Sequence, residues 1–309
     1  MYCKLIVNPA SGAWDIRREL PAVLNYLENQ GWLTTLHETR RSGEATVLAR
    51  QARDEGADSV LVVGGDGTIN EVINGLAESR VALGVLPGGT SNVWARELGL
   101  PTRSPLHLLP LVDSIKALVP GTHRRIDLGR ANGRYFLQWT GVGLDAEVTY
   151  VMEPRTRRQR RLGALGYLVA GVTTAAHMAG TRTRLWIDGE RIYRRSILVV
   201  ISNSQLYGGG VRIATDARLD DGLLDVSIFS GTGFGSAIRT LLGVITGLHV
   251  RDPRHSSFRA HSVRIEADKP MAVHVDGEPY GTTPLECQVV PRALTVLIPH
   301  RMRPELFSE

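Results

Sequence analysis

The sequence has only two cysteines, Cys3 and Cys287, which stand near opposite ends of the chain. They show neither the paired spacing of a zinc site nor the even series of a disulfide framework. A disulfide-stabilised secreted fold and a zinc-knuckle protein are therefore excluded. Two isolated cysteines fit a reducing compartment, so we expect a cytoplasmic protein.

Lysine is also scarce. Three lysines stand against 33 arginines, which are spread along most of the chain, and the formal net charge is +5. This balance favours an anionic partner, but it leaves open whether that partner is a nucleotide, a nucleic acid or an acidic membrane surface.

Long apolar runs are almost absent. The amino terminus "MYCKLIVNPASG" reads as a strand entering a turn and lacks the apolar segment of a secretory signal. The stretch 162–180, "LGALGYLVAGVTTAAHMAG", is nearly long enough to span a membrane, but four glycines, two threonines and His177 dilute it. We expect a helix that packs on the body of the protein, with the basic run "RTRRQRR" at its entrance.

The first 120 residues alternate between strand and helix patterns. Apolar, β-branched runs such as "KLIVNP", "DSVLVVGG" and "VALGVLPGG" predict strands, and helices are expected over 15–29, 43–56, 68–78, 90–98 and 105–118. Strands that alternate with helices indicate βαβ units and a mostly parallel sheet, whose ligands bind at the carboxyl ends of the strands.

The pattern changes near residue 122. Apolar strands around Asn-Gly and Asp-Gly turns predict antiparallel hairpins, with helices near 143–149, 162–179 and 234–247. We therefore expect a Rossmann-like α/β domain over 1–122, followed by a β-rich sandwich domain over 123–298. The C-terminal segment 299–309 is a candidate to rejoin the first domain.

Three glycine turns follow predicted parallel strands: "NPASG" (8–12), "GGDGT" (64–68) and "PGGTSN" (87–92). Glycine lets a backbone approach an anion, and a helix that begins there offers N–H groups and a positive dipole end. "GGDGT" alone is equally well explained as a tight strand-to-helix turn. It matches neither the P-loop nor the dinucleotide G-x-G-x-x-G pattern. Three such turns are expected to meet at one edge of the sheet.

These motifs, with "YGGGVRIATDARLDDGLLDV" and "VDGEP" after them, resemble the diacylglycerol kinase catalytic-domain family, the bacterial lipid kinases related to sphingosine and ceramide kinases. The resemblance covers almost the whole chain. "GGDGT" alone would also suit NAD kinases and 6-phosphofructokinases. The family combines an α/β nucleotide domain with a β-rich domain, and the resemblance implies ATP as phosphoryl donor and Mg²⁺.

The resemblance implies the following ATP-site residues: Asn8, Thr39, Gly64, Gly65, Asp66, Gly67, Thr68, Ile69, Asn70, Gly88, Gly89 and Thr90. It places Asp66 near the Mg²⁺ and the phosphates. It also implies a structural magnesium site in which Asp221 supplies a carboxylate and Arg218 and Leu223 supply backbone carbonyls. Without the resemblance, "RLDDGLL" is a polar hairpin turn.

The chain departs from the family at Val93, where many members have an aspartate after "GTSN". We expect Asp276, in "HVDGEPYG", to be the general base, with Glu278 as its neighbour or substitute, so Asp66, Asp276 and Glu278 form the candidate catalytic set.

"WIDGERI" (186–192) contains the same three letters, D-G-E, in what reads as an ordinary hairpin. "GTGFGSAIRT" (231–240) is interpreted as a loop with a helix start, and the histidines show no metal-ligand spacing.

The resemblance leads us to expect an ATP- and Mg²⁺-dependent lipid kinase with a diacylglycerol-like acceptor. A kinase for a soluble acceptor such as NAD, and a nucleotide-binding regulatory protein that has lost turnover, stay as alternatives. Nothing resembles a nucleic-acid recognition element. The basic run "RTRRQRR" either is a solvated surface of the protein or makes a peripheral contact with the inner face of an anionic membrane. The lipid acceptor and a homodimer are left open.

Overall fold

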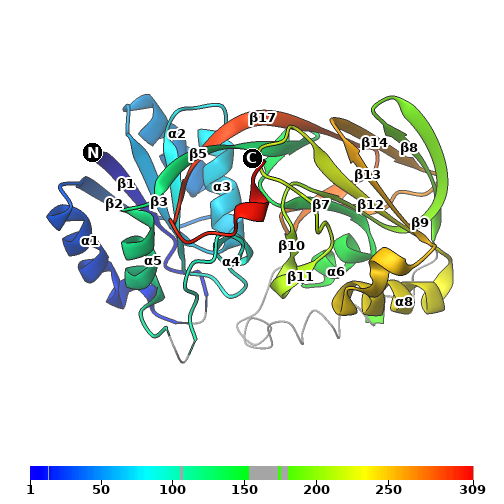
Figure 1. Cartoon of the computed structure of the whole chain (residues 1–309), viewed down its shortest axis with the longest axis horizontal. Helices are drawn as coiled ribbons and strands as arrows, with labels where there is room; N and C mark the ends of the chain where they lie inside the picture. Colours follow the sequence, from blue (N-terminus) through cyan, green and yellow to red (C-terminus); the bar gives the residue numbers. More distant parts are fainter. Residues whose placement is uncertain (13, 105–106, 153–172, 175–179, 309) are drawn as a thin grey trace. The chain divides into compact units, whose positions relative to one another are not determined.

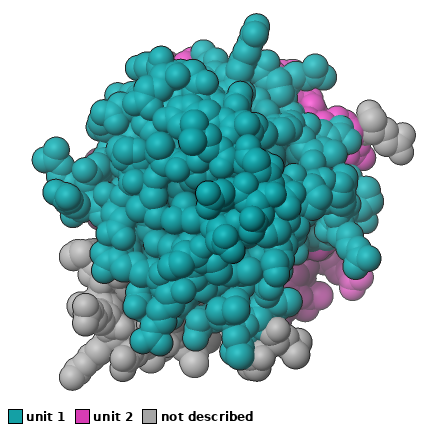
Figure 2. All heavy atoms as spheres, turned by 90° about the vertical axis from the view of Figure 1, so that its left-hand side faces the viewer, with its two compact units in different colours: residues 1–127, 292–305 teal, residues 128–291, 306–309 magenta. Residues whose placement is uncertain are grey.

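The computed structural model describes residues 1–12, 14–104, 107–152, 173–174 and 180–308 (Figure 1). The basic run at 155–161 and most of the expected helix over 162–179 lie outside the described residues. Among those described, no helix has both the length and the apolar character that crossing a membrane requires. The chain folds into two compact units, coloured separately in Figure 2: unit 1 is Met1–Asp127 with Arg292–Glu305, and unit 2 is Leu128–Pro291 with Leu306–Glu309.

Unit 1 is built on a parallel sheet in the order β2-β1-β3-β4-β17. The two central strands, β3 and β4, are buried along their whole length, which explains why their sequences are continuously apolar. The strands are β1 (Tyr2–Val7), β2 (Leu33–Glu38), β3 (Ser59–Gly64), β4 (Ala82–Pro87) and the end of β17 (Leu285–Ile298). Thr295 and Val296 of β17 pair in parallel with Ala82 and Leu83 of β4.

The helices of unit 1 connect these strands. Helix α1 packs with α5, and α2 packs with α3, so that the two pairs cover the two faces of the sheet (Figure 1). The helices are η1 (Ile16–Arg18), α1 (Leu20–Asn29), α2 (Glu44–Asp54), α3 (Asp66–Leu76), α4 (Val93–Glu97), α5 (Pro110–Leu118) and η4 (Pro304–Leu306). The last helix that the sequence predicts in this region, over 105–118, begins at Pro110, where the proline ring fits the first helical turn.

Unit 2 is largely antiparallel. Its longest strand, β9, pairs with β7, β8 and β12, and apolar side chains from these strands form one core that includes Leu185, Val199 and Val226. The strands are β5 (Thr122–Ala131), β6 (Arg134–Phe136), β7 (Trp139–Gly143), β8 (Thr181–Ile187), β9 (Glu190–Ser202), β10 (Leu206–Tyr207), β11 (Val211–Arg212), β12 (Leu224–Ser230), β13 (His255–Ala260), β14 (Ser262–Ala267), β15 (Ala272–Val275) and β16 (Glu278–Thr282). The helices are α6 (Leu144–Met152), η2 (Gly208–Gly210), α8 (Gly233–Thr246) and η3 (Leu248–Arg251).

Three hairpins turn at the dipeptides that the sequence marks. Asn132, Asp188 and Asp276 have φ angles of 43°, 48° and 46°, and a glycine with positive φ follows each of them. Asparagine and aspartate tolerate this left-handed conformation better than most residues, and it matches the twist of a two-residue hairpin. These turns close the β5–β6, β8–β9 and β15–β16 hairpins, as the sequence predicts.

Candidate active site

The three glycine turns of unit 1 lie at the carboxyl ends of β1, β3 and β4, and they touch one another. The backbone N–H of Asn8 donates to the carbonyl of Val63 at 2.9 Å, and the N–H of Gly88 donates to the carbonyl of Gly64 at 2.9 Å. The N–H of Gly65 donates to the Ser11 hydroxyl at 3.3 Å. The structure thus brings together the three motifs that the sequence singles out.

Glycine is required where the turns meet. A Cβ on Gly89 would lie 2.5 Å from the Cα of Gly65, and one on Gly12, whose φ is +71°, would lie 2.4 Å from the carbonyl oxygen of Gly88. Any larger residue would push these backbones apart. The close approach leaves the loop 64–68 and the first turn of α3 lined by main chain, as a phosphate-binding site needs.

Asp66 is the first residue of α3, and its carboxylate bonds to the start of α4. The N–H groups of Val93 and Trp94 donate to its two oxygens, each at 3.2 Å. These groups belong to the first turn of α4 and have no partner inside that helix. Val93, where the family resemblance leads us to expect an acid, has a buried side chain and contributes its backbone N–H to Asp66.

A pocket of about 160 Å³ opens beside the "PGGTSN" turn. Its lining includes Gly89 and Thr90 together with two arginines, Arg96 and Arg103. The Arg103 guanidinium stacks over the Trp14 ring at 5.3 Å from the ring centroid. Two guanidinium groups next to a glycine turn make this pocket suitable for an anion such as a phosphate.

The other predicted ATP-site residues lie around the same turns. Asn8 donates from Nδ2 to the Thr68 hydroxyl at 2.8 Å, and the N–H of Thr39 donates to the carbonyl of Val7 at 2.8 Å. Thr68, Ile69 and Asn70 are buried within α3, whereas Thr90 is exposed. The buried members shape the loop, and groups at its surface are the ones available to a ligand.

The predicted magnesium residues form a turn of unit 2. The Asp221 carboxylate accepts the N–H of Leu223 at 3.0 Å and pairs with the Arg259 guanidinium, and Arg218 is exposed. Burial raises the pKa of the nearby Asp225 to about 6, Arg259 opposes this rise, and the carboxylates of Asp221 and Asp216 add to it.

The Asp221 and Asp216 carboxylates raise the pKa of Asp225, so negative charge gathers at this turn and a cation would be stabilised there; the residues fit the implied metal. The described residues contain no cluster of three or more histidine, cysteine or acidic side chains placed to hold a metal ion. Magnesium held by one carboxylate, backbone carbonyls and water does not need such a cluster.

Asp276, the predicted base, is buried, and its carboxylate is hydrogen-bonded to the backbone. Its carboxylate accepts the N–H groups of Leu137, Gln138 and Trp139 at 2.8, 2.9 and 3.1 Å. These donors belong to the chain that enters β7, which pairs with β15. Asp276 therefore fixes the β15–β16 turn against the neighbouring strand. The Asp188 carboxylate acts in the same way, because it accepts the N–H groups of His261 and Ser262.

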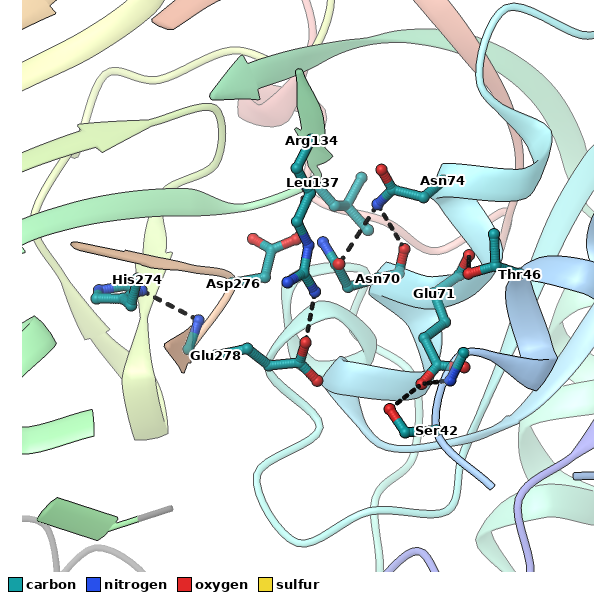
Figure 3. A network of polar contacts seen from close by, with 12 residues as sticks. Ser42, Thr46, Asn70, Glu71, Asn74, Arg134, Leu137, His274, Asp276 and Glu278 are labelled. Carbon is teal, nitrogen blue, oxygen red and sulfur yellow. Dashed lines mark hydrogen bonds and ion pairs between the residues drawn. The ribbon is translucent and has the colours of Figure 1, made fainter. Parts of the chain in front are cut away.

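Glu278, two residues further on, is the more accessible acid of this turn. Its side chain is 38% exposed and forms an ion pair with Arg134, which comes from β6 (Figure 3). The counterpart of Glu278 in the other D-G-E turn is Glu190, which is exposed at the start of β9. The pairing with Arg134 and the partial burial thus distinguish Glu278 from an ordinary hairpin residue.

A second polar group supports the same turn. The Nδ1 atom of His274 lies 3.2 Å from the N–H of Gly277, and its Nε2 lies 2.7 Å from the Oδ2 atom of Asp145. Because Nδ1 accepts the hydrogen bond from Gly277, Nε2 carries the ring proton and donates it to Asp145. The Tyr207 hydroxyl donates to the same oxygen at 2.7 Å, and burial followed by the Asp145 charge raises the pKa of Tyr207.

Sequence reasoning missed these residues. Asp145 lies in the first turn of a helix, His274 lies in a strand, and Tyr207 belongs to a strand of two residues, so no spacing connects them. One signal was available for the group as a whole: Gly141 sits in a β-strand, where glycine is disfavoured. A Cβ at Gly141 would lie 2.0 Å from Asp145 Oδ2 and 2.4 Å from His274 Nε2.

An α/β unit with glycine turns at the carboxyl edge of its parallel sheet, followed by an antiparallel β unit, is an architecture that suits a nucleotide-dependent phosphotransferase. The model of the diacylglycerol kinase catalytic domain matches residues 3–131. The model described as the YegS C-terminal NAD kinase beta sandwich-like domain matches residues 139–298. The chain belongs to the diacylglycerol kinase family and is a lipid kinase, which confirms the family, the fold class and the enzyme class that the sequence predicts.

Individual relatives agree over the whole chain. A diacylglycerol kinase of Bacillus subtilis (strain 168) is 32% identical over 305 residues, which is 98% of each chain. A diacylglycerol kinase of Staphylococcus carnosus (strain TM300) is 31% identical over 91% of this chain and 90% of its own. A crystal structure of a diacylglycerol kinase from Bacillus anthracis str. Sterne has a TM-score of 0.77 at 27% identity, covering 98% of this chain and 97% of that chain.

Proposed function

We propose that this lipid kinase uses ATP and Mg²⁺ to phosphorylate the hydroxyl of a diacylglycerol-like lipid. The observation that carries the proposal is the convergence of the turns at Gly12, Gly65 and Gly89 at one sheet edge, where their backbones are in contact. The names of the relatives support the acceptor, since the curated proteins described above are diacylglycerol kinases.

In this proposal the loop 64–70 binds the phosphates of ATP through main-chain N–H groups and the amino-terminal end of α3. Arg96 and Arg103, which line the adjacent pocket, neutralise negative charge on the nucleotide. Phosphoryl transfer has a loose transition state, so positioning and charge neutralisation supply most of the catalysis. Asp66 acts by holding α4 against the loop.

We assign the general base to Glu278. Asp276 already accepts three backbone N–H groups, so protonation would weaken the turn that it holds, whereas Glu278 is partly exposed and paired with Arg134. This proposal exchanges the two roles that the sequence predicts, in which Asp276 is the base and Glu278 is its neighbour. His274, held by Asp145 and Tyr207, is a positioning residue because it bonds to Gly277, next to the base.

Magnesium at the 218–223 turn would be held by the Asp221 carboxylate and by the carbonyls of Arg218 and Leu223. When bound, the ion supplies positive charge that stabilises this acidic region. Asp220 anchors the same turn, because its Oδ1 accepts the N–H and the hydroxyl of Ser308 at 2.6 and 2.7 Å.

The direct test is incubation of the purified protein with [γ-³²P]ATP, Mg²⁺ and single acceptors: diacylglycerol, a sphingoid base, phosphatidylglycerol and NAD. We expect label in the diacylglycerol product and loss of that label when EDTA is added. Label in NAD alone would select a kinase for a soluble acceptor. Binding of ATP without transfer to any acceptor would select a nucleotide-binding protein without turnover.

A further inference from the structure

Helix α8 lies at the edge of unit 2 (Figure 1), and several of its apolar side chains are exposed to solvent. Phe234, Leu242 and Ile245 of α8 are 49%, 54% and 47% exposed, and Leu248 and Val250 of the following η3 are 57% and 53% exposed. We call these five residues the α8 surface. Phe234, Leu242 and Ile245 are spaced by eight and three residues, which places them on one side of α8, and η3 follows directly with Leu248 and Val250.

The opposite side of α8 already packs on the protein. Ala237, Thr240 and Val244 are buried there, and Ile238 and Leu241 are half-buried between the two sides. A surface helix of a globular protein normally carries polar residues on its solvent side. The apolar character of both sides of α8 is therefore unexplained by the packing of this unit.

Most charges around the α8 surface are basic, since residues 231–254 contain three arginines and one aspartate, Asp252. Residues 231–251 contain no aspartate or glutamate, and they contain Arg239 and Arg251. Arg239 bonds to Asp252 at 2.6 Å, while Arg251 and Arg254 are exposed at the end of the surface. Exposed apolar side chains bordered by arginines are complementary to the headgroups and acyl chains of an anionic bilayer.

We propose that the α8 surface docks this protein on an anionic membrane, with Phe234, Leu242, Ile245 and Leu248 inserted among the lipids. The proposal deepens and rests on the proposed function, because a diacylglycerol-like acceptor resides in a bilayer. With 14 residues, α8 is too short to span that bilayer, so it lies along the surface.

The fold connects the α8 surface to the candidate site within unit 2. Helix α8 packs against β11, and His249 of η3 contacts the carbonyl of Ile213 at 3.1 Å. Strand β11 pairs with β10, where Tyr207 bonds to Asp145. Docking through α8 therefore orients the hairpin that carries Tyr207 at the membrane.

The test compares the full-length protein with the triple variant Leu242→Gln/Ile245→Gln/Leu248→Gln in co-sedimentation with vesicles. Glutamine is chosen because it keeps a high helix propensity. The matched control is Leu33→Gln, an exposed leucine of unit 1 (69%). One set of vesicles contains phosphatidylglycerol and the other phosphatidylcholine alone.

We expect wild type and Leu33→Gln to bind the phosphatidylglycerol vesicles, and the triple variant to need at least about tenfold more lipid. Binding should weaken when KCl is raised from about 0.1 to 0.5 M, because salt screens the arginines. Arg251→Gln, a single exposed change that spares the fold, should weaken binding in the same direction.

Equal vesicle binding by the triple variant and Leu33→Gln would overturn the proposal. So would a triple variant that loses self-association in size-exclusion chromatography while its vesicle binding is unchanged, because the α8 surface would then cover a second copy. Kinase activity on diacylglycerol in detergent micelles is measured in parallel. Its absence in wild type contradicts the proposed acceptor, whereas vesicle binding is read independently of it.

Discussion

Replacement of Asp276 by asparagine tests whether this residue is a structural anchor of the catalytic turn. Asparagine has nearly the same shape, but it replaces one carboxylate oxygen with an NH₂ group. In the best orientation its oxygen still accepts the N–H groups of Gln138 and Trp139, and its NH₂ then faces the N–H of Leu137. One charge-assisted bond is lost and two are weakened to neutral ones.

The magnitude follows from these contacts. A hydrogen bond to a charged group contributes about 1.5–3 kcal/mol, and a neutral one about 1 kcal/mol. Losing one and weakening two predicts that Asp276→Asn lowers the free energy of unfolding by about 3–5 kcal/mol. Glu278→Gln, at a partly exposed ion pair, should lower it by less than about 1 kcal/mol.

The assay is urea unfolding followed by tryptophan fluorescence, with Asp188→Asn as the matched control. Asp188 has the same turn, the same following glycine and a φ of 48°, but it is exposed, so its cost should be about 1 kcal/mol. If Asp276→Asn unfolds within about 1 kcal/mol of wild type, the anchoring role is wrong and Asp276 becomes the better candidate for the base.

Three further outcomes are expected. Gly89→Ala places a Cβ 2.5 Å from the Cα of Gly65, so it should destabilise unit 1 by about 1–3 kcal/mol and weaken ATP binding in a nucleotide titration. Unchanged ATP affinity would contradict the role of the Gly65–Gly89 contact in nucleotide binding. Tyr207→Phe removes the hydroxyl bonded to Asp145, so it should lower kcat up to about tenfold and leave the KM for ATP unchanged. Steady-state kinetics with both substrates varied checks this prediction. Burial lowers the pKa of His255 to about 4, below its unfolded value of about 6.5, so the unfolded state binds the proton more tightly and the free energy of unfolding falls from pH 6.5 toward pH 4. His255→Phe should remove about 1 kcal/mol of that loss at pH 5, after allowance for solvent screening. An unchanged pH dependence of unfolding in this variant would refute the prediction.

Much of unit 1 is predictable because its signals are local. The strand "SVLVVG" is continuously apolar since both faces of β3 are buried, and the turn after it carries glycine because Gly65 touches Gly89. The Asn-Gly and Asp-Gly turns of unit 2 are predictable for the same reason, as residue 276 and the glycine after it both need positive φ.

The site in unit 2 depends on contacts between residues distant in the sequence. The three donors to Asp276 come from residues 137–139, and Asp145 meets His274 and Tyr207 only after β7, β15 and the β10–β11 hairpin are in place. A local reading of "VDGEP" therefore favours Asp276, which has the stronger turn signal, whereas we propose Glu278 as the base. Periodicity likewise predicts α8 but not the exposure of its apolar side, because a sequence does not reveal which faces find partners.

Phosphoryl transfer from [γ-³²P]ATP to diacylglycerol by wild type, Glu278→Gln and Glu190→Gln tests whether this lipid kinase uses Glu278 as its base. The two glutamates occupy the same position in the two D-G-E turns, and only Glu278 is paired with Arg134. The account predicts that Glu278→Gln lowers kcat by about 10²-fold or more with ATP affinity intact, while Glu190→Gln matches wild type. Equal activity of the two variants, or no transfer by wild type, would contradict it.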